Sequence, residues 1–246
     1  SQGAPRRRNR PFLAVVEDDG ELVGAAVMTP PRKLVLYSHL SDCQPVVQAL
    51  WDVLQGSRWT VPGVLGPANV ADAWAEMWHE ENGRSPKPGM MQRVFDLRQI
   101  QPLTLPSGQL RLANADDFER VVGWVQGFHE DANIRDDLES AELLARGKMQ
   151  NGDLFLWENE AGEPVSMAAI SRPTRHGISV SLVYTPAELR GRGYATACVA
   201  TLSQQLLAEG YQFCTLFTDL SNPVSNHIYE QIGYTAVADF HEYYFD

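Results

Sequence analysis

Residues 179–196 read SVSLVYTPAELRGRGYAT, an apolar strand that runs into a glycine-rich turn and then into a helix. The alternation of Val and Leu with Ser favours a strand that ends near Tyr184. Gly191 and Gly193 have no Cβ, so consecutive backbone N–H groups of the turn can approach a ligand. With the positive end of the helix dipole behind them, these groups predict a site for an anion such as a pyrophosphate.

The side chains of the same turn support that interpretation. Arg190 and Arg192 can add charge-assisted contacts to phosphate, and the small Ala195 lets the helix start come close. A P-loop would need Gly-x-x-x-x-Gly-Lys-Ser/Thr, which this turn does not have, and a dinucleotide fingerprint would need a small residue where Thr196 stands. The alternative is an ordinary solvated turn that begins a helix.

The chain contains an internal repeat. Phe12–Lys33 reads FLAVVEDDGELVGAAVMTPPRK and Leu154–Arg175 reads LFLWENEAGEPVSMAAISRPTR, a gapless match at an offset of 142 residues. Each copy predicts a β-hairpin, and each continues with strand, helix, strand, helix and strand. These elements are expected at 34–37, 46–54, 60–65, 71–81 and 93–97 in the first copy, and at 178–184, 195–208, 213–218, 224–231 and 236–245 in the second.

This order of elements predicts an α/β protein with a mixed sheet that occurs twice. The second copy alone carries the segment 109–151, with a short strand and two helical patterns; the first copy is either abridged or lacks residues upstream of Phe12. The expected domains are 11–101 and 109–246, joined by a linker at 102–108 that contains two prolines and a glycine. Residues 1–10 are expected to be disordered or derived from cloning.

Composition narrows the class of function. The net charge of −11 disfavours binding to nucleic acid or to an anionic membrane and suits a cationic substrate such as an amine. Three widely spaced cysteines indicate neither a disulfide framework nor a zinc site, and His176 and His227 have no partner at metal-ligand spacing. We therefore expect a cytoplasmic, metal-free protein. Dimerisation through edge strands stays open.

The second half resembles the GNAT acetyltransferase superfamily. Its CoA-binding signature, Gln/Arg-x-x-Gly-x-Gly/Ala, is matched by Arg190, Gly193 and Ala195. About thirty residues later, members commonly show an Asn, a helical Tyr, and a Gly before an aromatic residue, which are here Asn222, Tyr229, Gly233 and Tyr234. The resemblance covers 109–245 and extends to 11–101 only as a degenerate GNAT-like copy without the CoA loop.

The resemblance implies an N-acetyltransferase that uses acetyl-CoA and acts on a small-molecule or peptide amine. The backbone of Val183, Tyr184 and Thr185 would run along the pantetheine arm, while the next strand splays away. The pyrophosphate would lie on the turn formed by Arg190, Gly191, Arg192, Gly193, Tyr194, Ala195 and Thr196, and Asn222 would contact the cofactor. The amine would attack the thioester directly, a backbone N–H near Tyr184 would stabilise the oxyanion, and Tyr229 would act as the general acid.

One feature departs from the family pattern. Many relatives have a Glu on the strand before the loop, whereas Ile178–Tyr184 contains no carboxylate. The general base is therefore unassigned, and His129, Glu130 and Asp131 are candidates by position only. Two alternatives to an enzyme remain: a non-catalytic module that binds CoA or acyl-CoA, and a tandem scaffold whose first copy, rich in tryptophan, binds a partner. Core packing is the simpler interpretation of those tryptophans, Trp51, Trp59, Trp74 and Trp78.

Overall fold

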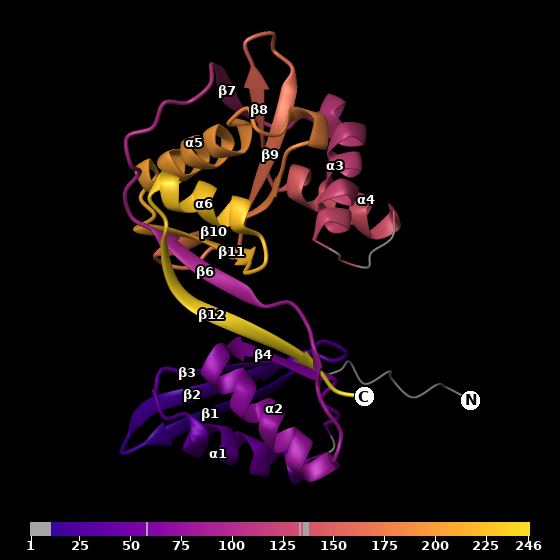
Figure 1. Cartoon of the computed structure of the whole chain (residues 1–246), viewed down its shortest axis with the longest axis vertical. Coiled ribbons are helices and arrows are strands. Elements are labelled where there is room, and N and C mark those ends of the chain that lie inside the picture. Colours follow the sequence, from indigo (N-terminus) through magenta and orange to yellow (C-terminus); the bar gives the residue numbers. More distant parts are fainter. Residues whose placement is uncertain (1–10, 58, 133, 135–137) are drawn as a thin grey trace, which may run out of the picture. The chain divides into compact units, whose positions relative to one another are not determined.

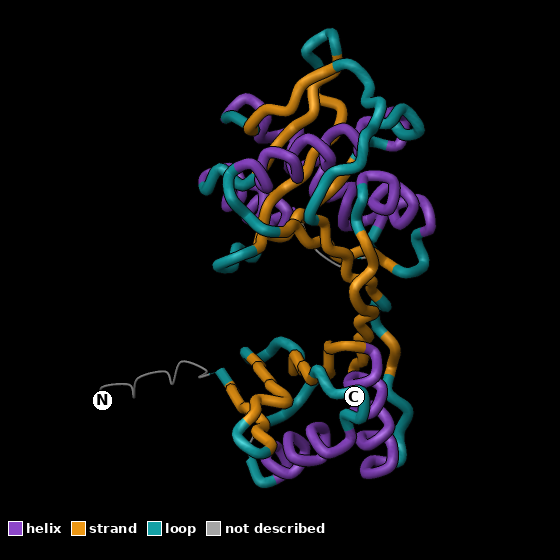
Figure 2. Tube along the Cα trace, turned by 90° about the vertical axis from the view of Figure 1, so that its left-hand side faces the viewer, coloured by secondary structure: helices purple, strands orange, loops and turns teal. Residues whose placement is uncertain are grey.

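The computed structural model describes residues 11–57, 59–132, 134 and 138–246, so the expectation for residues 1–10 lies outside the described part of the chain (Figure 1). The described chain divides into two compact units. Unit 1 comprises the chain up to Arg93 together with Ala238–Asp246, and unit 2 comprises Val94–Val237. Strands and helices alternate in both, which confirms the expected mixed α/β class (Figure 2).

Unit 1 is a sheet with two helices on one of its faces. Its elements are β1 (Phe12–Asp18), β2 (Glu21–Met28), β3 (Leu34–Ser38), α1 (Gln44–Gln55), β4 (Gly63–Pro67), α2 (Ala68–Asn82) and β5 (Lys87–Pro88). The strand order is β1-β2-β3-β4, and β4 is followed by the last strand of the chain, β12 (Thr235–Tyr244). Both helices lie on the same side of the strands (Figures 1 and 2).

The tryptophans of unit 1 fill this core. Trp51 and Trp74 are 7% and 1% exposed, with ring centroids 5.0 Å apart. Trp78 stacks on Phe245 at 4.7 Å, and Trp59 packs edge-on against Phe12 at 6.2 Å. Packing, rather than recognition of a partner, therefore accounts for these side chains.

Unit 2 is a sheet covered on both faces. After β6 (Gln92–Leu97) its elements are β7 (Gly108–Leu112), α3 (Phe118–Asp131), α4 (Leu138–Gln150), β8 (Leu154–Asn159), β9 (Pro164–Ser171), β10 (Gly177–Tyr184), α5 (Tyr194–Ala208), β11 (Phe213–Asp219) and α6 (Pro223–Ile232). The strand order is β6-β11-β10-β9-β8-β7. α5 and α6 lie over one face of the sheet, and α3 and α4 lie over the other (Figure 1). Each pair of helices covers its own cluster of buried residues. Within the described residues, no helix is both long and apolar enough to span a bilayer.

The two hairpins of the repeat differ by one residue in their turns. Val16 pairs with Gly24 and Glu17 with Leu22, whereas Trp157 pairs with Ser166 and Glu158 with Pro164. The second strands of the hairpins therefore correspond at the offset of 142 residues, but the first strands correspond at 141. A gapless sequence match hides this difference, because apolar residues occupy both faces of β1 and β8 and either offset aligns them.

The last strands of the two copies are exchanged. β6 ends the first copy in sequence, yet it is hydrogen-bonded to β11 of the second copy, and its Phe95 and Leu97 are 0% and 1% exposed in the unit 2 core. β12 ends the second copy, yet its residues 240–244 pair with β4 of the first. Composition alone cannot reveal such pairing.

The division between the units consequently falls at residues 93/94 and 237/238, not at the expected linker 102–108. Leu103 and Leu105 of that segment pack against the unit 2 core. Smaller differences are the strand expected at 60–65, which lies at Gly63–Pro67, and the short β5, which was not expected. Pro62 precedes β4, and Pro67 is the N-cap of the helix that follows at once.

Candidate active site

Strand β10 carries a bulge close to its carboxyl end. Ser181 pairs with Ala169 and Tyr184 with Met167, so β10 has one more residue than β9 between these pairs. Leu182 adopts a φ of 49°, an uncommon conformation for a residue other than glycine. A bulge leaves backbone groups out of the regular ladder. The N–H and C=O groups around Leu182 and Val183 are thus candidates for binding a ligand through the backbone.

The neighbouring strand separates from β10 before this bulge. The parallel pairing of β10 with β11 covers Gly177 to Ser179 only, although both strands continue beyond it. The last pair is joined by its side chains, because the Ser179 Oγ lies 2.7 Å from the Thr215 Oγ1. Past this pair, no strand among the described residues pairs with the edge of β10 on the β11 side.

The chain leaves β10 through a turn that ends at the start of α5. Gly191 and Gly193 have φ angles of 75° and 77°, in the left-handed region that glycine adopts most readily. Gly193 is the N-cap of α5, and no side chain caps this helix. The first N–H groups of α5 therefore have neither an intrahelical partner nor a side-chain cap. A Cβ built on Gly191 would meet no heavy atom within 4 Å, so the backbone there is open to a ligand.

Arg190 fixes this turn to its surroundings. Its Nε donates to the Thr185 carbonyl at 2.9 Å, its Nη2 donates to Asp131 at 2.5 Å, and its guanidinium lies 5.7 Å from the Tyr184 ring centroid. The side chain thus holds the loop against the end of β10 and the end of α3. Arg192 is exposed and donates to the Glu188 carbonyl at 3.3 Å, on the loop itself.

Ser166 on β9 is hydrogen-bonded to the two residues that follow the bulge. Its Oγ donates to the Tyr184 carbonyl at 3.1 Å and lies 2.9 Å from the Thr185 Oγ1. The Tyr184 and Thr185 carbonyls are therefore engaged within the protein. Of the three predicted pantetheine residues, Val183 is the one whose position in the bulge best suits a backbone contact.

Tyr229 lies in the core beneath α5 and α6. It is 8% exposed, and its ring is 6.3 Å from that of Phe95 and 6.0 Å from that of Tyr234. Burial, and the charge that Cys198 would carry, raise the pKa of Tyr229 to about 12. Burial also raises the pKa of Cys198 to about 12. The phenol therefore keeps its proton throughout the physiological range.

Asn222 begins α6. Its side chain accepts a hydrogen bond from the Ser225 N–H at 3.1 Å, and Pro223 follows at the first helical position. This is the geometry of a helix N-cap. At the other end, Gly233 has a φ of 112°, and a Cβ there would lie 2.9 Å from the Gln99 carbonyl oxygen. The Tyr234 hydroxyl lies 2.8 Å from the Ser203 Oγ inside the core.

The three candidate bases have different surroundings. His129 is buried at 7% exposure on α3, Glu130 is exposed, and Asp131 is paired with Arg190. The Asp131 carboxylate is therefore held by the Arg190 guanidinium, which also donates to the Thr185 carbonyl. Among the described residues there is no cluster of three or more His, Cys, Asp or Glu side chains that could hold a metal.

Sequence reasoning missed two residues that shape the site. Ser166 is fully buried beneath Tyr184 and Thr185, and no local pattern distinguishes it from other strand serines. Gly127, on α3, lies so close to the Tyr184 ring that an added Cβ would overlap the hydroxyl. A glycine inside an amphipathic helix can mark a close packing contact, but Gly123, one turn earlier, gives the same signal with no such contact.

Comparisons with known proteins agree with this geometry. A family profile described as "Acetyltransferase (GNAT) family" matches residues 129–234. No curated protein sequence matches the chain significantly. The solved structures that it resembles include an acetyltransferase from the GNAT family of Colwellia psychrerythraea, 13% identical with a TM-score of 0.63 over 95% of this chain and 85% of that chain.

Two further structures extend the likeness. A GCN5-related N-acetyltransferase from Kribbella flavida is 15% identical, with a TM-score of 0.61 over 97% of this chain and 90% of that chain. A tandem GNAT protein from the clavulanic acid biosynthesis pathway is 11% identical, with a TM-score of 0.52 over 95% of this chain and 82% of that chain. At such identities the likeness establishes the fold alone. Residues 129–234 match the acetyltransferase (GNAT) family profile, and the chain as a whole has the fold of GNAT structures, among them a tandem GNAT protein.

Proposed function

We propose that the chain is an N-acyltransferase that moves an acetyl group from acetyl-CoA to a primary amine, with its site in unit 2. One observation carries the proposal: β10 bulges at Leu182, separates from β11 after Ser179, and leads into an open glycine turn at the start of α5. A single strand and its following turn thus present unpaired backbone groups to an extended ligand at one end and to an anion at the other.

The donor-binding residues follow from the same elements. The N–H groups of the turn and of the first helical residues, Gly191 to Thr196, are suited to the pyrophosphate, because α5 directs its positive end at them. Arg192 can reorient from the Glu188 carbonyl towards phosphate, whereas Arg190 positions the loop. Val183 would hold the pantetheine arm through its backbone, and Asn222 would contact the cofactor from the start of α6. Acetyl-CoA, when bound, supplies the acyl group as a thioester.

Tyr229 is the proposed general acid. A phenol with a pKa of about 12 is a poor acid for a thiolate in water, where thiol pKa values are near 8.5. The buried thiol of Cys198 also has a pKa of about 12, because the same loss of solvent destabilises the thiolate. Shielding a leaving thiolate from water would likewise make it a stronger base, and proton transfer from the phenol would then be more favourable than in water.

The acceptor is proposed to be an amine that arrives uncharged or loses its proton to water. β10 provides no carboxylate, and Asp131 is already paired with Arg190. The hydroxyls of Ser179 and Thr215 lie at the point where the strands separate, and the hydroxyl of Ser181 follows on β10. The net charge of −11 favours a basic compound over an acidic one as the acceptor.

A non-catalytic acyl-CoA-binding module is the second candidate. The absence of a strand carboxylate favours it, since such a module needs the donor site but no base. Both candidates require donor binding, so they differ only in turnover.

The test begins with calorimetric titration of acetyl-CoA into the wild type and the Gly191→Glu variant. The new carboxylate would occupy the open space over the turn and repel the pyrophosphate, so binding should be lost. Gly162→Glu is the matched control, because Gly162 has a φ of 76° and equally open surroundings on the β8–β9 turn. Binding that survives in Gly191→Glu would remove this turn from the donor site. If the wild type binds acetyl-CoA and Gly191→Glu does not, turnover with a panel of amines distinguishes the enzyme from the binding module.

A further inference from the structure

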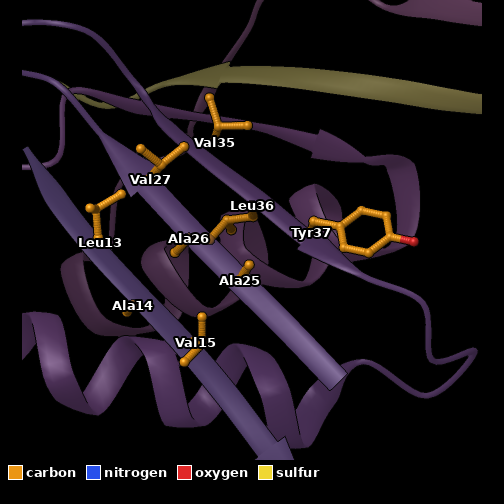
Figure 3. A pocket seen from close by; sticks show the side chains of 9 residues that line it. All are labelled: Leu13, Ala14, Val15, Ala25, Ala26, Val27, Val35, Leu36 and Tyr37. Atoms are coloured by element: carbon orange, nitrogen blue, oxygen red, sulfur yellow. The ribbon is translucent and has the colours of Figure 1, made fainter. Parts of the chain in front are cut away.

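The outer face of the unit 1 sheet is apolar and exposed. The bare face, as we call it, consists of the outward side chains of β1, β2 and β3: Leu13, Val15, Ala25, Val27, Val35 and Tyr37 (Figure 3). Leu13, Val15 and Tyr37 are 70%, 62% and 53% exposed. Contiguous apolar patches of this kind commonly mark interaction sites.

The sequence of these strands is typical of a sheet that is buried on both faces. FLAVV and LVLY have apolar residues at every position, whereas a strand with one face in water alternates apolar and polar side chains. The alternate residues, including Ala14, Ala26 and Leu36, point towards the core under α1 and α2. The apolar residues of the opposite face are accounted for if that face also has a partner.

The internal repeat identifies the kind of partner. By the registers of the two hairpins, Leu13 and Val15 correspond to Leu154 and Leu156, and Ala25 and Val27 correspond to Met167 and Ala169. Tyr37 pairs with Ala25 as Tyr184 pairs with Met167. The unit 2 residues are Leu154, Leu156, Met167 and Ala169, each 0% exposed beneath α3 and α4.

We propose that the bare face is the docking site of an amphipathic helix from a partner polypeptide, which takes the position over unit 1 that α3 takes over unit 2. An apolar helix face on an apolar sheet surface is an established mode of recognition. The equivalent surface in unit 2 shows that this sheet geometry accepts a helix with Val121 and Val125 as its buried residues.

The charge on unit 1 defines one end of the partner helix. In unit 2, the Arg120 Nη1 on α3 donates to the Pro164 carbonyl at the hairpin turn, at 3.3 Å. The corresponding turn of unit 1 carries four exposed carboxylates, Glu17, Asp18, Asp19 and Glu21. A lysine or arginine of the partner therefore fits above this turn, as Arg120 does above the turn of unit 2.

Tyr37 indicates which residue the other end of the partner helix must carry. The Tyr184 ring packs against Gly127, where a Cβ would not fit, and Gly127 lies seven residues after Arg120. Tyr37 occupies the same register. The partner helix is thus expected to carry a basic residue, apolar residues one and five positions later, and a glycine seven positions later, because a Cβ there would overlap the Tyr37 hydroxyl, as one at Gly127 would overlap that of Tyr184.

The test uses the full chain and a synthetic peptide of residues 115–132, which contains α3, as the probe. Methyl NMR spectra are recorded while the peptide is added. We expect saturable shifts at Leu13, Val15, Val27 and Val35, weakened by salt, and about tenfold weaker binding by the Arg120→Glu peptide. A second peptide, residues 114–151, adds α4 in case the shorter one forms too little helix.

Chain variants complete the test. Val15→Asp should abolish the shifts, whereas Val53→Asp, on the exposed side of α1 at 54% exposure, should leave them unchanged. No saturable shift with either peptide at millimolar concentration would overturn the proposal, as would shifts confined to unit 2. If the chain alone forms a dimer that Val15→Asp dissociates, the face belongs to a second copy and the helical partner is wrong.

Discussion

Arg190 and Asp131 join the loop before α5 to the end of α3, with the Arg190 Nη2 at 2.5 Å from the Asp131 Oδ2. The two residues are 59 positions apart in the chain and come from different elements. The side chains are 47% and 51% exposed, so solvent screens the pair and its share of the global stability is small. Its role is local: together with the bond to the Thr185 carbonyl, it sets where the loop lies.

Asp131→Asn separates a positioning role from a role as general base. We expect the free energy of unfolding to fall by less than about 1 kcal/mol, because the pair is half exposed. The KM for acetyl-CoA should rise with little change in kcat, since a looser loop weakens donor binding. Glu130→Gln is the neighbouring control. A fall in kcat of about a hundredfold or more, with KM unchanged, would instead identify Asp131 as the base.

Gly127→Ala should destabilise unit 2. The added Cβ would overlap the Tyr184 hydroxyl, so the ring must move from between α3 and Arg190. Overpacking of this kind costs about 1–3 kcal/mol. Gly123→Ala, one turn earlier on the same helix, has open space and should stabilise by roughly 0.5–1 kcal/mol through helix propensity. Urea unfolding of both variants measures the difference; equal effects would mean that the Tyr184 contact is unimportant.

The elements whose signals are local could be predicted from the sequence. The hairpins, β10 and the helices follow from apolar periodicity, and the turn at Gly191 and Gly193 follows from two glycines that lack a Cβ and precede a helix. The bulge could not be predicted, because Leu182 adopts its φ of 49° without any residue type that marks it. The Arg190–Asp131 ion pair could not be predicted for another reason: the two residues are 59 positions apart, and no local sequence pattern links them.

The exchange of β6 and β12 was hidden for a third reason. Both strands have compositions that suit either sheet, so their partners depend on the fold of the whole chain. The expected linker looked like a boundary because it contains proline and glycine, yet its leucines belong to the unit 2 core. Pro106 even lies against the turn before α5, 3.5 Å from where a Gly193 Cβ would be.

The exchange predicts how the chain can be shortened. A fragment that begins at residue 102 loses β6, and with it Phe95 and Leu97 from the unit 2 core, so we expect it not to fold. A fragment that begins at residue 90 keeps this strand and should retain more of the native circular dichroism spectrum. A folded, acetyl-CoA-binding fragment from residue 102 would show that β6 is dispensable.

Phe95→Ala tests the same strand in the full chain. The side chain is fully buried, and its removal should lower the stability of unit 2 by about 3–5 kcal/mol. Leu112→Ala, at 48% exposure on β7, is the control and should change stability by less than about 0.5 kcal/mol. Hydrogen exchange of β8 to β11 amides reports on unit 2 directly. Unchanged protection in Phe95→Ala would contradict the assignment of this residue to the unit 2 core.

The burial of Tyr229 has a consequence at alkaline pH. Its pKa is about 12 in the folded chain and near 10 when unfolded, so the folded state holds this proton more tightly. The resulting stability is fully present below about pH 10 and is lost as the pH rises towards 12, an effect on the order of 2–3 kcal/mol. Tyr229→Phe should therefore lose less stability than the wild type across this window, measured by denaturant unfolding at each pH.

The same shift constrains the kinetics of Tyr229. Because the phenol keeps its proton below about pH 10, the Tyr229→Phe variant should lower kcat by the same factor at every pH from about 6 to 9.5. The loss is expected to lie between about ten- and a thousandfold with acetyl-CoA affinity retained, as for the removal of a general acid. An alkaline limb in the wild-type profile that vanishes in Tyr229→Phe would show that the phenol ionises within this range. An unchanged kcat would mean that the leaving thiolate takes its proton from another group, and the buried phenol would then belong to the core alone.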